Sequence, residues 1–401
     1  MNIPFSPPFI GEEEIKAVSE TLRSGWITTG PKTKEFERRL SEFCGTEKTV
    51  CLNSATAALE MILRAFGIGP GDEVITTAYT YTASASVTTH IGATLKLVDC
   101  KKDSYLIDVQ EIEKAITEKT KAIIPVDIGG MVADYQSILK IAEDKKSLFT
   151  PKNELQKVFG RILVIADAAH SLGSEYCGKN AAGFPDFATF SFHAVKNLTT
   201  GEGGAVTWKH HDGLDSEALY KKLQLLSLHG QSKDALSKMQ KGAWEYDVVA
   251  PYYKCNMTDI MASIGICQLD KYEFIIEKHR KMAARYDEAV KELGLRANEH
   301  TTQLYRSNCH LYMLNIGKND PELRNRYINL MAERDISCNV HFKPLPLLTA
   351  YKNLGFCIED YPNAYHQFIN EISLPIYTGM TDDEQTYVMD ALKSVTEELC
   401  F

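Results

Sequence analysis

A lysine within an apolar stretch of the chain has the clearest chemical potential. Lys196 lies in the run Phe190–Leu198, and Gly201, Gly203 and Gly204 follow it closely. Desolvation lowers the pKa of a lysine, and the neutral amine is the form that attacks a carbonyl carbon. We therefore expect Lys196 to be a nucleophile toward a carbonyl group.

A carboxylate follows the most apolar predicted strand. Asp167 comes directly after the run Ile162–Ala166, and His170 lies three residues further on. A buried carboxylate is costly unless it meets a cation, and a protonated pyridine nitrogen is such a cation. The alternatives are that Asp167 caps the following helix and that His170 only packs in the core.

Small and hydroxyl residues open a predicted helix at Ser54, Ala55 and Thr56. The unpaired N–H groups and positive dipole end of a helix N-terminus suit a phosphate dianion, although Ser54 could simply be a helix cap. Ser191, five residues before Lys196, could serve the same phosphate. Tyr81, after the strand Glu73–Thr76, could stack on a flat heteroaromatic ring.

These residues together match the functional groups of pyridoxal phosphate (PLP). Lys196 would hold its carbonyl carbon, Asp167 its ring nitrogen, and the helix start its phosphate. The chain order of these residues is more specific than any one of them alone. We therefore predict that PLP is the cofactor and that there is no metal site.

Strands that could position these groups alternate with helical stretches over roughly the first 210 residues. The predicted strands are Glu73–Thr76, Leu95–Asp99, Ala122–Val126, Ile162–Ala166, Ala188–Phe192 and Gly204–Thr207. Most are continuous apolar runs, which is typical of strands buried on both faces of a parallel sheet. Ligands of such sheets bind at the carboxyl ends of the strands, which is where Asp167, Ser191 and Tyr81 lie.

The pattern becomes mainly helical from Thr258 onward. We predict a helix capped by Thr258 and ending near Leu269, and a long charged helix over Glu273–Leu293. Weaker strands at His310–Ile316 and Ser337–Asn339 indicate a second, smaller domain. We expect a large PLP-binding domain over 1–260 and a small α+β domain over 261–401, with the boundary between residues 255 and 300.

One segment of the large domain departs from this alternation of strands and helices. Residues Lys145–Gly160 are polar and rich in lysine, and we expect them to be a solvated surface excursion.

Composition excludes several classes of protein. The 401 residues include 44% hydrophobic and 24% charged residues, as in an ordinary globular protein, and the net charge of −9 gives no support to nucleic-acid binding. No apolar run approaches the roughly 20 residues of a membrane span, and no signal peptide is visible. The ten cysteines form no Cys-x-x-Cys pair, so we expect reduced thiols and a cytoplasmic location.

The chain resembles the PLP-dependent sugar-nucleotide aminotransferases of the DegT/StrS group. The resemblance covers nearly the whole chain. It rests on the segments Gly25–Pro31, Gly69–Ile75, Ile124–Val126, Asp167–His170, Ser191–Gly204, Asn256–Ile260 and Ser373–Pro375. It implies an α/β fold of the fold type I class, in which helices cover a mostly parallel seven-stranded sheet and a smaller C-terminal α+β domain follows.

The resemblance also implies roles for individual residues. Lys196 and Asp167 match the catalytic pair. The positions that match cofactor contacts are Ser54, Ala55, Thr56, Tyr81, His170, Ser191, His193 and Asn256. Asn256, or Lys254 in its place, would reach across a homodimer to the partner's phosphate. Thr29, His341 and Lys343 match substrate positions. The family usually has glycine where this chain has Ala55.

The implied reaction moves an amino group from L-glutamate to a nucleotide-linked keto-sugar. The residues around His193 are similar to those of enzymes that act at sugar carbon 4, such as the UDP-4-amino-4-deoxy-L-arabinose aminotransferase group, so we expect a 4-keto substrate. Candidates for the diphosphate contact are His341, Lys343, Lys32 and Arg306.

Two other functions fit the same motifs. One is a lyase or desulfurase of the same fold, which would need a mobile cysteine or a second acid near the cofactor; the only cysteines near the motifs are Cys177 and Cys255. The other is a regulator that keeps the PLP site without catalysis.

Overall fold

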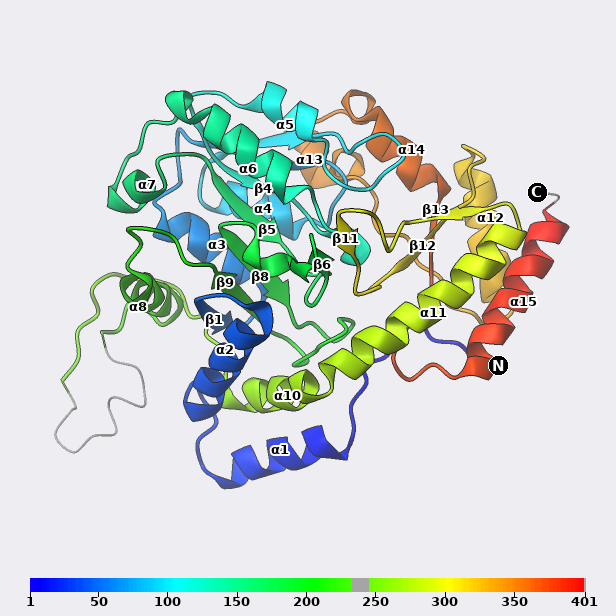
Figure 1. The fold of residues 1–401 in the computed structure, drawn as a ribbon, viewed down its shortest axis with the longest axis horizontal. Coiled ribbons are helices and arrows are strands. Elements are labelled where there is room, and N and C mark those ends of the chain that lie inside the picture. Colours follow the sequence, from blue (N-terminus) through cyan, green and yellow to red (C-terminus); the bar gives the residue numbers. More distant parts are fainter. Residues whose placement is uncertain (233–244, 400–401) are drawn as a thin grey trace.

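Seven mostly buried strands of five residues form the central sheet of the protein (Figure 1). The computed structural model describes residues 1–232 and 245–399. Across the sheet, the strands follow the order β1 (Lys48–Leu52), β9 (Gly204–Trp208), β8 (Phe187–Ser191), β5 (Leu163–Asp167), β4 (Thr120–Ile124), β2 (Glu73–Thr77) and β3 (Thr94–Val98). Only β9 runs opposite to the other strands of this sheet. The predicted mostly parallel seven-stranded sheet is confirmed.

Helices cover both faces of the sheet because alternate residues of each strand point to opposite sides. On one side Ile75, Ile123 and Val164 pack with helices α2 (Pro31–Cys44), α5 (Val109–Ala115), α6 (Tyr135–Asp144) and α10 (Asp259–Asp270). On the other side Val74, Ile124 and Ile165 pack with α3 (Ala55–Ala65), α4 (Ala83–His90) and α8 (Ser216–Ser227). The sheet is therefore the middle layer of three.

A second, smaller sheet lies in the C-terminal part of the chain. Its order is β10 (Arg296–Ala297), β12 (Tyr312–Asn315) and β13 (Glu371–Leu374), and all its pairs are antiparallel. Packed around it are helices α12 (Pro321–Ala332), α14 (Pro362–Asn370) and α15 (Asp382–Glu398) (Figure 1). Apart from the long helix α11, the remaining α-helices of the described residues are α1 (Glu12–Arg23), α7 (Glu154–Phe159) and α13 (Thr349–Asn353).

Helix α11 (Tyr272–Glu292) joins the two regions (Figure 1). Its first turns bury Tyr272, Ile275 and Ile276 in the core of the large region. Its later turns bury Met282 and Tyr286 in a separate core around the small sheet. This change of core within one helix supports a proposed domain boundary inside α11, within the expected range of 255–300.

The strand predictions need correction. Strands β1, β10 and β13 were not among the predicted strands. Ser337–Asn339 is not a strand, since only Asn339 forms an isolated bridge, to Ser373.

The segment Lys145–Gly160 is not a purely solvated excursion. It contains α7, whose Phe159 ring packs 5.2 Å from Phe66 and whose buried Gln156 donates to the Phe66 carbonyl at 2.8 Å. Because the segment is rich in lysine, its sequence pattern did not indicate that Gln156 and Phe159 are buried.

Candidate active site

A cavity of about 380 Å³ lies at the carboxyl edge of the large sheet. Strands β1, β2, β4, β5 and β8 end at this edge, and β9 begins there because it runs the opposite way. The predicted site residues that line it are Ser54, Ala55, Thr56, Tyr81, Asp167, His170, Ser191, His193, Lys196 and His341. Segments far apart in the sequence are therefore gathered at one place, as expected for an open α/β sheet.

Lys196 reaches this cavity from the loop between β8 and β9. Its backbone N–H donates to the His193 carbonyl at 2.9 Å, which closes a turn directly after β8. Burial lowers the pKa of the Lys196 amine to about 8, and the Asp167 carboxylate opposes this shift. A substantial fraction of the amine is therefore neutral near physiological pH, as a nucleophile requires.

Asp167 ends strand β5 inside the cavity and is almost fully buried. It accepts hydrogen bonds from the Ser84 hydroxyl at 2.7 Å and from the Ala169 N–H at 3.3 Å. Burial raises the pKa of this carboxyl group, and these contacts and Lys196 offset the shift in part. No ion pair of Asp167 occurs among the described residues, so the carboxylate is available to a cation that enters the cavity.

The N-terminus of α3 faces the cavity as predicted. Ser54 is its N-cap and accepts from the Ala57 N–H at 3.1 Å, so the capping and cavity-lining interpretations hold together. The first N–H groups of the helix, at Ala55 and Thr56, have no partner within the helix. They can bind an anion without competition from the helix itself.

Gly204 allows β9 to approach this helix start closely. A Cβ atom at Gly204 would lie 2.2 Å from the Ser54 carbonyl carbon and 2.3 Å from the Ala55 nitrogen. Since real Cβ atoms do not approach backbone atoms so closely, only glycine fits here without moving α3. The anion site at Ala55 and Thr56 therefore depends on a glycine that is distant in the sequence.

His170 is buried against two other cavity residues. Its ring lies 4.4 Å from the His310 ring and 5.9 Å from the Phe342 ring. Burial, followed by the charge of Lys196, lowers the pKa of His170 well below its ordinary value, so the ring is neutral. Because the Gly129 N–H donates to Nδ1 at 3.1 Å, the ring proton lies on Nε2.

His310 is a cavity residue that the motifs did not identify. Its Nδ1 lies 2.7 Å from the Asn197 side-chain oxygen, next to Lys196 in the chain. Asp127 also lines the cavity and was missed, although it follows a predicted strand as Asp167 does. Asp127 accepts from the Ala133 N–H, the Ser171 hydroxyl and the Tyr135 hydroxyl, and burial raises its pKa to about 7.

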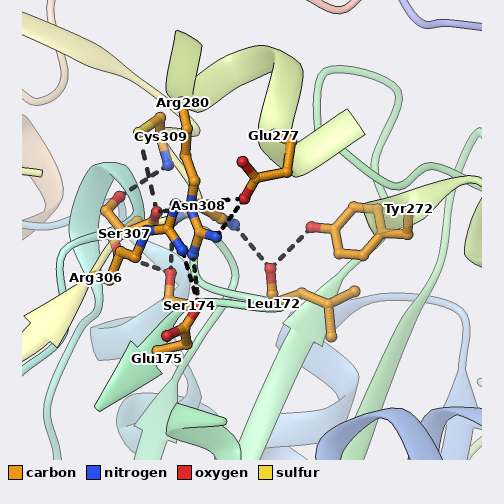
Figure 2. Close-up of polar contacts among 11 residues, drawn as sticks. Leu172, Ser174, Glu175, Tyr272, Glu277, Arg280, Arg306, Ser307, Asn308 and Cys309 are labelled. Atoms are coloured by element: carbon orange, nitrogen blue, oxygen red, sulfur yellow. Dashed lines mark hydrogen bonds and ion pairs between the residues drawn. The ribbon is translucent and has the colours of Figure 1, made fainter. Parts of the chain in front are cut away.

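A polar network fixes the segment that carries His310 (Figure 2). Asn308 donates to the Leu172 carbonyl at 2.9 Å and accepts from the His310 N–H at 3.1 Å. Arg280 of α11 donates to the Ser307 carbonyl at 2.9 Å and pairs with Glu175 at 3.0 Å. These contacts hold residues 307–310 against the loop that follows Asp167.

The remaining predicted residues lie elsewhere. Thr29, Asn256 and Lys254 form a hydrogen-bonded cluster that does not line the cavity, although Asn256 forms a bridge to Leu52 next to it. Lys343 and Lys32 are exposed. Arg306 pairs with Glu277 at 3.5 Å and Glu175 at 3.8 Å.

His193 and Tyr81 are exposed at the cavity. His193 lies 3.7 Å from Glu202, and the Tyr81 ring, 62% exposed, lies 5.8 Å from Phe342.

The described residues contain no group of three or more His, Cys, Asp or Glu side chains that could hold a metal ion. In the same part of the chain, no helix is both long enough and apolar enough to cross a bilayer.

The donor set of the cavity fits PLP group by group. A partly neutral lysine, a buried carboxylate without a cation and an open helix N-terminus match its carbonyl, ring nitrogen and phosphate.

Comparisons with known proteins agree with this assignment. Residues 8–393 match the model of the DegT/DnrJ/EryC1/StrS aminotransferase family. The chain is 36% identical to the spore coat polysaccharide biosynthesis protein SpsC of Bacillus subtilis, over 98% of this chain and 97% of SpsC.

Solved structures extend the likeness to the whole fold. The PMP-form of Spr1654 from Streptococcus pneumoniae has a TM-score of 0.97 and 54% identity, covering 99% of this chain and 100% of that one. A PLP-form of Spr1654 has a TM-score of 0.96 and 52% identity, covering 100% of both chains. PseC of Helicobacter pylori, an aminotransferase involved in the biosynthesis of pseudoaminic acid, has a TM-score of 0.86 and 28% identity. The match covers 99% of this chain and 100% of PseC.

The predicted fold type I architecture, PLP cofactor and transaminase class are confirmed by these matches. The chain therefore belongs to the DegT/DnrJ/EryC1/StrS family of sugar aminotransferases.

Proposed function

We propose that this protein transfers an amino group from L-glutamate to carbon 4 of a nucleotide-linked keto-sugar. The observation that carries this proposal is the single cavity in which Lys196, Asp167 and the α3 N-terminus meet. The sugar substrate class is supported by the similarity to PseC and SpsC. The preference for carbon 4 rests on the residues around His193 and is the part to be tested first.

The proposed roles follow from the proton affinities of the cavity residues. PLP, when bound, withdraws electrons from the substrate carbon that loses its proton. Lys196 would accept that proton and return it, since a pKa of about 8 lets its amine do both near neutral pH. Asp167 would hold a proton on the ring nitrogen, and His170 would donate its Nε2–H to an oxygen of the cofactor.

The phosphate would be held by the helix N-terminus at Ala55 and Thr56, with Ser191 beside it. All three residues line the cavity near Gly203. These N–H groups lie at the N-terminus of α3, which is the positive end of the helix dipole. Both features favour the binding of a dianion. Ala55 in place of the family's usual glycine retains the N–H that this contact requires.

The charges of the cavity support a homodimer. Lys196 is the one lysine or arginine among the described residues that line it, whereas Asp127, Asp167 and Glu202 are acidic. A phosphate, a nucleotide diphosphate and the carboxylates of glutamate need more positive charge than one lysine supplies. We propose that Lys254 and Asn256 of a second copy complete each site.

Complementation between inactive variants tests this dimer. Lys196→Ala and the double variant Lys254→Ala/Asn256→Ala would be co-expressed with different tags, and the mixed dimer purified. One of its two sites would then hold an intact set of residues, so activity absent from both parents should return. Mixed dimers without activity would contradict shared sites.

Amino transfer itself is tested by colour and product. The yellow protein should convert to the pyridoxamine form with L-glutamate, and subsequent addition of UDP-, dTDP- or GDP-linked 4-keto-sugars should restore the yellow form. A matched set of 3-keto-sugars shows whether the amino group is transferred to carbon 3 or to carbon 4 of the sugar. No change with any amino acid would indicate a regulator.

Conversion with cysteine alone would indicate a desulfurase. The cysteines near the motifs do not favour this alternative. Cys255 is buried and its pKa is raised to about 11, and Cys177 does not line the cavity.

Cysteine chemistry supports the proposed cytoplasmic location. The nine cysteines in the described ranges are free thiols, five of them in the cores of the two regions. Thiols of this kind persist in reducing compartments.

A further inference from the structure

Two polar side chains of β13 are linked by hydrogen bonds to His341, which lines the cavity. Because residues two apart in a strand share a face, Glu371 and Ser373 lie on one side of β13, while Ile372 and Leu374 pack in the small-domain core on the other. Both Glu371 and Ser373 are fully buried. The mechanism proposed above uses neither residue.

These side chains form a continuous chain of contacts to His341. The His341 backbone N–H donates to Glu371 Oε2 at 2.9 Å. The other carboxyl oxygen, Oε1, is in hydrogen-bond contact with the Ser373 hydroxyl. The same hydroxyl oxygen lies 2.8 Å from His341 Nδ1. Since Nδ1 is occupied and His341 lines the cavity, the nitrogen left for a ligand is Nε2.

The direction of these hydrogen bonds depends on one proton. A backbone N–H can only donate, so Glu371 Oε2 must accept, and a proton on a neutral carboxyl group must lie on Oε1. Oε1–H then donates to Ser373, Ser373 donates to Nδ1, and the imidazole proton lies on Nε2. If Glu371 is ionised, the Ser373 hydroxyl donates to Oε1 and the His341 Nδ1–H donates to Ser373, so Nε2 carries only a lone pair, while the backbone N–H of His341 still donates to Oε2.

The surroundings of Glu371 favour the neutral carboxyl group. No ion pair of Glu371 occurs in the described ranges; Arg324 of α12 donates to its backbone carbonyl at 3.1 Å instead. A buried carboxylate without a paired cation is strongly disfavoured. Burial raises the pKa of Glu371 to about 8, and Ser373, the His341 N–H and Arg324 reduce the shift.

We propose that Glu371 is a positioning residue that, through the Ser373 hydroxyl, holds His341 in the tautomer with an Nε2–H donor facing the cavity. The identity of the ligand rests on the proposed function, whereas the tautomer does not. Burial and Lys196 lower the pKa of His341 to about 3, so it stays neutral and would bind as a donor rather than as a cation. A neutral N–H donor suits a keto, hydroxyl or carboxylate oxygen of the substrate and gives little help to a diphosphate.

This assignment makes His341 sensitive to pH above neutrality. Ionisation of Glu371 above a pH of about 8 would remove the donor from Nε2. The other groups that interact with Glu371 are Tyr79, Tyr105, Cys338 and Arg324. The first three stay neutral in this range because burial raises their pKa values, and Arg324 stays charged. Lys196 also titrates near 8, so activity alone cannot isolate Glu371.

The first test is therefore spectroscopic and needs no substrate. Purified protein labelled with ¹⁵N-histidine is measured by NMR between pH 6.5 and 9.5, with His341→Gln used to assign the signal. At pH 7 His341 should be the Nε2–H tautomer, and it should shift to Nδ1–H as the pH passes about 8. An Nδ1–H tautomer at pH 7, or one tautomer throughout this range, would overturn the proposal.

Two variants separate positioning from mere packing. Glu371→Gln keeps the shape, and its amide nitrogen donates to Ser373 at every pH, so His341 should stay Nε2–H up to pH 9.5. Ser373→Ala breaks the chain of contacts and should leave a mixture of tautomers at every pH. Glu37→Gln is the matched control, because Glu37 is also a buried acid that accepts from a backbone N–H and a hydroxyl, at Cys51 and Tyr220. It should leave His341 unchanged.

Kinetics then connect the tautomer to substrate binding. Ser373→Ala should raise KM for the substrate that His341 contacts by about five- to tenfold, the value of one lost hydrogen bond, with a smaller change in kcat. Glu371→Gln should keep the wild-type KM at pH 7 and lose its rise above pH 8. If the tautomers behave as stated while no amino transfer occurs, the proposed function is wrong and the positioning role stands.

Discussion

The Lys196 amine and the Asp167 carboxylate line one cavity, and each reduces the effect of burial on the other. Burial lowers the pKa of Lys196 and raises that of Asp167, so both groups tend toward their neutral forms. The attraction between their charged forms opposes both shifts. The pair therefore keeps a lysine that can lose its proton beside an acid that can still be ionised.

Replacement of Lys196 should abolish both covalent cofactor binding and amino transfer. Lys196→Ala is expected to lose the absorbance band near the visible edge and to show no product, because Lys196 is the one lysine among the described residues that line the cavity. Absorbance spectra and product assays check this. Lys222→Ala is the control, since burial also lowers the pKa of Lys222 although it does not line the cavity. Amino transfer retained by Lys196→Ala would contradict the assignment.

The cofactor-free protein should gain stability with pH because of Lys196. The folded-state pKa of about 8 lies below the ordinary 10.5, so the unfolded chain binds more protons between these values. Stability then rises as pH increases from about 8 to 10.5, and Lys196 destabilises the fold below 8 by roughly 3 kcal/mol. Lys196→Met should therefore raise the Tm of the cofactor-free protein at pH 7 and have little effect at pH 10.5. Equal Tm values at pH 7 would contradict this.

Replacement of Asp167 by asparagine should slow turnover more than it weakens the fold. The amide keeps the shape but cannot stabilise a proton on the ring nitrogen, and loss of one oriented electrostatic partner costs about 10²–10³ in kcat. Some cofactor should still bind. Asp127→Asn is the comparison, because Asp127 lines the same cavity while its oxygens are occupied by protein donors. It should lower Tm but change kcat less than tenfold.

Local patterns in the sequence predicted most of the fold. The run before Asp167 is apolar throughout and the run before Ser191 is apolar except for Thr189, so their strands were found to within two residues. β1 was missed because Lys48–Leu52 merges with the helix start at Ser54, and its pairing with β9 is a contact between residues about 150 apart. The order of strands in the sheet depends on such distant pairings, which no local pattern contains.

The site was predicted where chemistry lies at a strand end. Asp167 was identified at the end of a predicted strand, Lys196 in the apolar run that includes the next predicted strand, and Ser54 at a predicted helix start. Asp127 could have been identified by the rule that found Asp167. His310 and Glu371 could not, because His310 is placed by Asn308 and Asn197, and Glu371 acts through β13, which was not predicted. The alternation of polar and apolar residues in Glu371–Leu374 was the available signal.

Gly204 should be essential for cofactor affinity. Gly204→Ala would force the α3 N-terminus away from β9, because its Cβ would lie 2.2 Å from the Ser54 carbonyl carbon. We expect at least a tenfold weaker affinity for PLP and about 1–3 kcal/mol of lost stability, typical of overpacking. Equilibrium dialysis and thermal unfolding measure these. Gly183→Ala, where a Cβ meets no atom within 4 Å, should change neither.

The Arg280 network should contribute far more stability than a surface network of similar composition (Figure 2). Arg280 is 12% exposed, pairs with Glu175 and Glu277, and donates to the Ser307 carbonyl. Arg280→Ala would leave the buried Ser307 carbonyl unsatisfied and would remove the cation from two partly exposed carboxylates, so we expect a loss of about 1–3 kcal/mol. Arg38 also pairs with two acids, Glu35 and Glu42, but is 54% exposed, so Arg38→Ala should cost less than about 1 kcal/mol. Chemical unfolding of both variants checks this difference.

Because the network holds the segment that carries His310, Arg280→Ala should also weaken PLP binding, whereas Arg38→Ala should not. Equal losses of stability in the two variants would show that the network does not fix this segment.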